Sequence, residues 1–114
     1  HCQALAPTWE VMAKVMFDAA DKEEEADEDY DQNDLKEAEK LDAPVFVGKV
    51  DCVTHHALCQ HQGIQAYPTL RLFFPRAEIA SDYHGQRTVM DMIQWLMIAE
   101  GELERENLLT PDII

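Results

Sequence analysis

The chain has 114 residues, enough for one domain with one main hydrophobic core. Its 9 basic and 23 acidic side chains give a net charge of −14. This sign argues against nucleic acid and anionic membranes as partners, because both bind patches of Lys and Arg. No apolar stretch approaches the roughly 20 residues that cross a bilayer. We therefore expect a soluble domain without membrane contact.

The first 20 residues predict a helix with one apolar face, whose side chains recur at spacings of four, three and four. These side chains are Leu5, Trp9, Met12 and Met16. Cys2 lies in the first turn, where unpaired N–H groups and the helix dipole stabilise a thiolate and lower the pKa of a cysteine from about 8.5. The alternative is a buried, inert cysteine. The chain opens on His1 without a leader, so we expect it to be a segment of a longer protein.

Residues 21–42 form an acidic insert. From Asp18 to Asp42 there are thirteen acids and three lysines, or −10, which leaves −4 for the rest of the chain. Few apolar residues and dense like charge favour a solvated segment that adds little to the core, with a short helix over 34–41. The spacing does not fit a calcium loop, because Gln32 stands where that loop needs glycine.

The remaining elements alternate between strands and helices. Residues 45–51 are apolar and β-branched and predict a central strand, and Thr54 is placed to cap a short helix that ends at Gly63. Further strands are expected over 70–74 and 79–84, followed by a final helix that Thr88 caps. From Gly101 onward the sequence is a polar extension that ends in apolar residues.

Pro68 stands at the start of the apolar run 70–74, where a proline cannot donate to the ladder of a sheet. An active-site position would explain it, since a cis bond between Tyr67 and Pro68 would bend the backbone and leave unpaired groups at a cleft. The alternative is a trans proline that opens a buried strand.

Three cysteines are present, so at least one has no partner within the chain. Cys52 and Cys59 lie seven residues apart, from a strand end to a helix, and one helical turn can bring their sulfur atoms together. Two reduced cysteines are an alternative. Zinc is a third, because His55, His56 and His61 lie nearby, but the cysteine spacing is wider than that of usual zinc pairs.

Several motifs together resemble the thioredoxin domains of the protein disulfide isomerase family. Residues 1–10, HCQALAPTWE, look like the second half of a Cys-x-His-Cys motif and the helix that follows it. The resemblance continues in order through Lys49-Val50-Asp51-Cys52, Leu58-Cys59, residues 64–69, the segment Tyr83-His84-Gly85-Gln86-Arg87 and Trp95-Leu96. It covers most of residues 1–98 apart from the insert.

The resemblance implies a thioredoxin-like α/β fold over 1–100, with a mixed central sheet flanked by helices, its first strand missing, and a C-terminal extension over 101–114. It implies that Cys2 is the resolving cysteine, that His1 is the intervening histidine, and that Pro68 is the cis-proline beside the disulfide. Arg87 would help to stabilise the thiolate form of Cys2. The nucleophilic cysteine would lie two residues before His1, outside the chain.

The implied activity is thiol–disulfide exchange on protein substrates with cysteines, in the lumen of the endoplasmic reticulum. An extended substrate would pair with Ala66, Tyr67 and Pro68 by strand-like hydrogen bonds. Neither a cofactor nor a metal is expected, and Cys52 and Cys59 are expected to form a disulfide. Two alternatives stay open: a redox-inactive module that binds clients or a partner subunit, and a cytosolic reductant with free Cys52 and Cys59.

Overall fold

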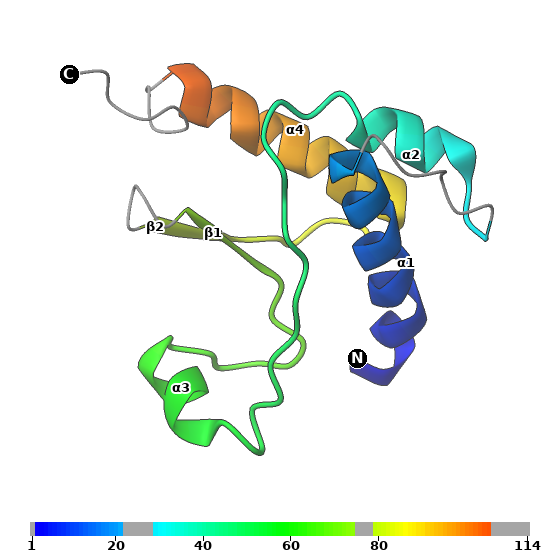
Figure 1. The fold of residues 1–114 in the computed structure, drawn as a ribbon. Helices are drawn as coiled ribbons and strands as arrows, with labels where there is room; N and C mark the ends of the chain where they lie inside the picture. The colour runs from blue at the N-terminus through cyan, green and yellow to red at the C-terminus, as the bar shows by residue number, and fades with distance from the viewer. Residues whose placement is uncertain (1, 22–28, 75–78, 106–114) are drawn as a thin grey trace.

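The computed structural model describes residues 2–21, 29–74 and 79–105 (Figure 1). Over these ranges the chain order is α1 (Cys2–Ala20), α2 (Gln32–Ala38), α3 (His56–His61), β1 (Arg71–Phe74), β2 (Ile79–Asp82) and α4 (Val89–Arg105). The predicted α/β class is confirmed. Expectations for His1, for residues 22–28, for the turn at 75–76 and for the apolar tail residues 108–114 lie outside the described residues.

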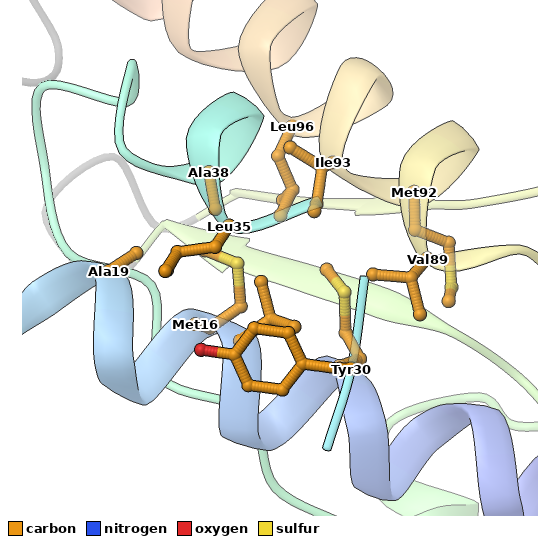
Figure 2. Close-up of a cluster of buried hydrophobic side chains, with 11 residues drawn as sticks. Met16, Ala19, Tyr30, Leu35, Ala38, Val89, Met92, Ile93 and Leu96 are labelled. Carbon is orange, nitrogen blue, oxygen red and sulfur yellow. The ribbon is translucent and has the colours of Figure 1, made fainter. Parts of the chain in front are cut away.

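The core lies between α1, α2 and α4, whose apolar faces meet in Figure 2. Val15 of α1 and Ile93 of α4 are fully buried at its centre. Buried positions recur every three or four residues along both long helices, as the sequence predicts. The other buried members of this cluster are Met12, Met16, Ala19, Tyr30, Leu35, Ala38, Val89, Met92 and Leu96.

The expectation that the acidic insert adds little to the core is wrong for its described part. Tyr30, Leu35 and Ala38 are 9, 7 and 2% exposed and belong to the core cluster. The Tyr30 hydroxyl also donates to a carboxylate oxygen of Asp18 at 2.5 Å, which ties the insert to α1. Within α2, Leu35 and Ala38 are buried although three of the seven residues are charged, so a count of charges hides the buried face.

The two strands pair antiparallel, with Arg71 opposite Asp82 at one end and Phe74 opposite Ile79 at the other. The strand predicted over 45–51 is not formed. A strand needs a neighbour that accepts and donates its ladder hydrogen bonds, and no described segment lies beside residues 45–51 as a strand. The expected mixed sheet is therefore a single antiparallel pair within the described residues.

Residues 44–48 keep the alternating exposure of a strand nevertheless. Val45 and Val47 pack against the core cluster, whereas Phe46 between them is 89% exposed. The indole N–H of Trp9 donates to the carbonyl of Gly48 at 3.1 Å and holds this segment against α1. The residues thus have the side-chain pattern of a strand without its hydrogen bonds.

Helix α4 begins as predicted, because the Thr88 hydroxyl accepts from the Asp91 N–H at 3.2 Å. It continues through Gly101 to Arg105, past the residue at which the polar extension was expected to begin, and Leu103 is buried. The Glu100 carboxylate accepts the backbone N–H groups of Asp42 and Ala43 at 2.8 and 2.9 Å. This contact joins α4 to the segment that follows α2. The domain boundary at residue 100 stays a prediction.

Candidate functional site

Cys2 is the first residue of α1, in the turn where backbone N–H groups have no partner within a helix. The neighbouring His1 lies outside the described residues. In Figure 1 the N-terminal end of α1 and the connection from α3 to β1 both lie on the side of the molecule away from α4.

The connection from α3 to β1 contains a cis peptide bond between Tyr67 and Pro68, as the sequence predicts. Tyr67 is 58% exposed, Ala66 is exposed and Pro68 is partly buried. The Thr69 hydroxyl donates to the Ala66 carbonyl at 2.6 Å and closes a tight turn over Tyr67 and Pro68. The residues predicted to bind substrate thus lie together in one turn on the surface.

Helix α3 leads into this connection, and its start differs from the expectation. Thr54 does not cap the helix, because His55 is the N-cap residue and makes no capping bond with its side chain. Instead the Asp51 carboxylate accepts the N–H of Val53 at 2.9 Å and the hydroxyl of Thr54 at 3.2 Å. The backbone N–H groups of Val53 and Thr54 lower the pKa of Asp51. Asp51 therefore organises the turn before α3.

Helix α3 ends as predicted at Gly63, whose φ of 69° lies in the left-handed region that favours glycine. The N–H of Gly63 donates to the carbonyl of Gln60, and the N–H of Ile64 donates to the carbonyl of Cys59, both at 3.0 Å. This pair of bonds is a Schellman motif, which turns the chain sharply out of the helix. The motif directs the chain toward Tyr67 and Pro68.

Cys52 and Cys59 form a disulfide, with their Cα atoms 5.6 Å apart. The predicted pairing is confirmed, and the alternatives of two reduced cysteines and of a zinc site with two thiolates are both wrong. Cys59 is 5% exposed, while its neighbour Leu58 is 49% exposed. Helix α3 packs against no other helix or strand of the described residues, and Figure 1 shows it set apart from them. The disulfide is thus a main tether of α3 to the chain before it.

Arg71 is a residue near the site that the sequence analysis missed. Its guanidinium donates to the Gln62 carbonyl at 2.6 Å and to both carboxylate oxygens of Asp82 at 2.6 and 3.3 Å. A signal was available in the sequence, because Arg71 and Asp82 are opposite charges in two strands joined by a short connection. The hairpin register that pairs them was needed to see it.

Arg87 lies on an exposed loop between β2 and α4, and it makes no hydrogen bond or ion pair with another described residue. Tyr83 shapes this loop: its hydroxyl donates to the carbonyl of Gln86 and its ring packs edge-on against Trp95. A Cβ atom at Gly85 would lie 2.6 Å from the Tyr83 hydroxyl, so this position requires glycine. Among the described residues, no hydrogen bond or ion pair joins Arg87 to Ala66, Tyr67 or Pro68.

Away from this end of the fold, Asp42, Glu100 and Glu104 place carboxylate oxygens within 4.8 Å of one another. Both Glu100 oxygens already accept backbone hydrogen bonds. A hydrogen bond with Asp42 is the main cause that raises the pKa of Glu104. This group is best described as a cluster of neighbouring acids in which Glu104 is the one whose pKa is raised.

The α/β fold, with a cysteine that begins a helix and a cis-proline turn before a strand, defines a thioredoxin-type domain. The family model of thioredoxin matches residues 31–98, which is more than half of the chain, and the chain belongs to this family. Its relatives place it with the protein disulfide isomerase type of thioredoxin domain, as the motifs of the sequence predict.

The chain is 29% identical to the thioredoxin domain-containing protein 5 homolog of Drosophila melanogaster, over 95% of the chain and 23% of that protein. It is 26% identical to protein disulfide-isomerase 5-4 of Arabidopsis thaliana, over 97% of the chain and 22% of that protein. It is 27% identical to human protein disulfide-isomerase A6, over 95% of the chain and 19% of that protein.

The chain therefore spans about a fifth of the length of these curated relatives. No solved structure matches it. Among the helices of the described residues, none combines the length and the apolar character that crossing a membrane requires.

Proposed function

We propose that this domain takes part in thiol–disulfide exchange on protein substrates, with Cys2 as the resolving cysteine. The observation that carries the proposal is the position of Cys2 at the first residue of α1, in a chain whose relatives are named protein disulfide isomerases. A helix N-terminus stabilises a thiolate, and the thiolate is the form that attacks disulfides. Its compartment would be the lumen of the endoplasmic reticulum, where structural disulfides such as Cys52–Cys59 persist.

The exchange step balances as follows. A client is first joined by a mixed disulfide to a cysteine two residues before His1, which the family motif implies. The Cys2 thiolate attacks the sulfur atom of that upstream cysteine, a new disulfide forms between the two active-site cysteines, and the client leaves as a thiolate. The client is thereby reduced, and the reverse sequence oxidises it. Ala66, Tyr67 and Pro68 would hold the client chain beside the reacting sulfur atoms.

Trapping of the mixed disulfide tests this proposal in the full-length protein. Cys2→Ser removes the attacking thiolate, so complexes with client proteins should accumulate and survive on non-reducing gels after the thiols are blocked. The matched control is the double variant Cys52→Ser and Cys59→Ser, which also replaces cysteine by serine but leaves Cys2. It should trap nothing.

Absence of trapped complexes in Cys2→Ser, together with no catalysed exchange by the unmodified protein, would contradict the proposal. That outcome favours the redox-inactive client-binding module. Binding of unfolded proteins without any catalysed exchange would identify such a module.

A further inference from the structure

Arg71 links three parts of the fold through one side chain. Its Nη1 donates to the carbonyl of Gln62, the C-cap residue of α3, at 2.6 Å. Its Nε and Nη2 donate to the two carboxylate oxygens of Asp82 on β2. The side chain is only 17% exposed and that of Asp82 is 33% exposed, so this bidentate pair is partly shielded from water. A guanidinium suits this place because its donors lie in one fixed plane.

The bond to Gln62 closes a loop. Gln62 and Arg71 are nine residues apart in sequence, and the chain between them holds Ala66, Tyr67 and Pro68. Apart from this bond, no hydrogen bond joins α3 or its C-cap to a strand among the described residues, and α3 packs against no other helix or strand there. The Arg71 guanidinium is therefore the link that fixes the distance between α3 and the sheet at the base of the loop.

We propose that Arg71 is a positioning residue, which anchors the loop of residues 63–70 and thereby sets the affinity for extended protein substrates. This inference rests on the proposed function, because it assumes that substrates bind at Ala66–Pro68. Within the loop, the Thr69–Ala66 bond and the Gly63 turn keep local shape. At its far end the Leu70 carbonyl accepts from the Tyr83 N–H at 2.8 Å and the Leu70 side chain packs against the core cluster, which holds residue 70 but not the end of the loop beside α3. Arg71 supplies that missing constraint.

Arg71 also pairs with the carboxylate of Asp82 at neutral pH. The hydrogen bonds from Arg71 lower the pKa of Asp82, so its carboxylate stays ionised through the neutral range. Asp82 accepts from Nε and Nη2, whereas Nη1 donates to the Gln62 carbonyl without involving Asp82. Loss of Asp82 weakens the strand pair but leaves the bond to Gln62, whereas loss of the Arg71 head group removes both.

This difference provides a test with a matched control, made in the full-length protein. Arg71→Met keeps much of the apolar stem and removes every donor, and Asp82→Asn keeps the shape and removes the charge. The first measurement is the kcat and KM of each protein with an unfolded protein disulfide and with oxidised glutathione, a short substrate that offers much less extended backbone to the loop. The second is hydrogen–deuterium exchange at residues 63–70 and in α4.

We expect Arg71→Met to raise KM for the protein disulfide about tenfold, since one charged hydrogen bond contributes roughly that factor. Its kcat, and its rate with glutathione, should stay within about twofold of the unmodified protein. Exchange should accelerate in residues 63–70 and stay unchanged in α4. Asp82→Asn should change KM by less than about twofold.

An equal rise of KM in Arg71→Met and Asp82→Asn would overturn the proposal, because the effect would then come from the strand pair. An unchanged KM in Arg71→Met, or an equal loss with glutathione, would also overturn it. If the unmodified protein exchanges neither substrate, the proposed function fails, and so does the proposed effect of Arg71 on substrate affinity. The hydrogen exchange then still decides whether Arg71 anchors the loop.

Discussion

Removal of the Cys52–Cys59 disulfide should loosen α3 without weakening the helical core. The perturbation is the double variant Cys52→Ala and Cys59→Ala, which breaks a link between residues seven apart. For a closed loop of this size, the disulfide lowers the entropy of the open chain and thereby stabilises the closed state by about 2.5 kcal/mol. This free energy corresponds to a factor of about 60 in the equilibrium for opening the loop.

The loss of stability should be confined to α3, because this helix packs against no other helix or strand of the described residues. Segments that share few contacts with the core open as separate units. Native-state hydrogen exchange measures this directly at the amides of Cys59, Gln62 and Ile64, which donate within or just after α3 in the unmodified protein. Their protection should fall by about 60-fold in the variant. Protection in α1 and α4 should not change.

Reduction of the unmodified protein with a mild thiol reductant is the control, and it should reproduce the pattern of the variant. Two results would refute the reasoning. An unchanged protection of α3 would mean that the disulfide contributes little to holding the helix. An equal loss of protection in α1, α3 and α4 would mean that α3 unfolds together with the core, contrary to its isolation in the structure.

Three further substitutions test the packing, the turn and the acids. Leu35→Ala should destabilise the fold by about 2–4 kcal/mol in urea titrations, because Leu35 is buried in the core. As a control, replacement of the exposed neighbour, Lys36→Ala, should cost less than about 0.5 kcal/mol. Equal losses in the two variants would contradict a buried role for α2. Gly63→Ala should cost about 1 kcal/mol through its positive φ alone, since nothing lies within 4 Å of the new Cβ, and exchange at α3 reports it. Glu104→Gln should raise the melting temperature at pH 7, because the pKa of Glu104 is raised by its hydrogen bond with Asp42, so the folded state is penalised once the pH exceeds that pKa. The difference should vanish below about pH 4, where the carboxyl is protonated in both states, and a constant difference across this range would contradict it.

The long helices and the hairpin could be predicted from the sequence because their signals are local. Spacings of three and four residues give the buried face of α1, and Thr88 gives the start of α4. Gly63 gives the end of α3, since its left-handed φ is a property of the turn itself. These features depend on a few neighbouring residues and need no knowledge of the rest of the fold.

Other features depend on partners that a local pattern does not contain. Residues 45–51 have the composition of a strand, yet a strand forms only beside a neighbour. In the acidic insert, Tyr30, Leu35 and Ala38 are spaced for a buried face, but the surrounding charge conceals them. Thr54 was chosen as a cap by residue type, although the Asp51 carboxylate, three residues earlier, accepts the bonds that shape the turn.

For the candidate site, the sequence predicts the cis peptide bond and the disulfide, but it does not predict the hydrogen bonds of Arg71. From the residues alone the cis bond at Pro68 and the disulfide were each one of several alternatives. The family resemblance favours both, and both are present. The roles of Cys2, Tyr67 and Arg87 stay predictions. The anchor at Arg71 depends on the register of β1 against β2 and on where α3 ends, so it could be seen only with both in place.

These observations separate two kinds of stabilisation within one small domain. Helices α1, α2 and α4 are held by apolar burial, which is spread over many side chains and tolerates small shifts. Residues 56–69 include only Cys59 among the buried residues and are held by single specific links: the disulfide, the Schellman turn and the Arg71 guanidinium. Because each link acts alone, its loss moves the substrate turn while the core stays folded. Substitutions in the core should therefore change stability first, and substitutions in these links should change exchange with protein substrates first.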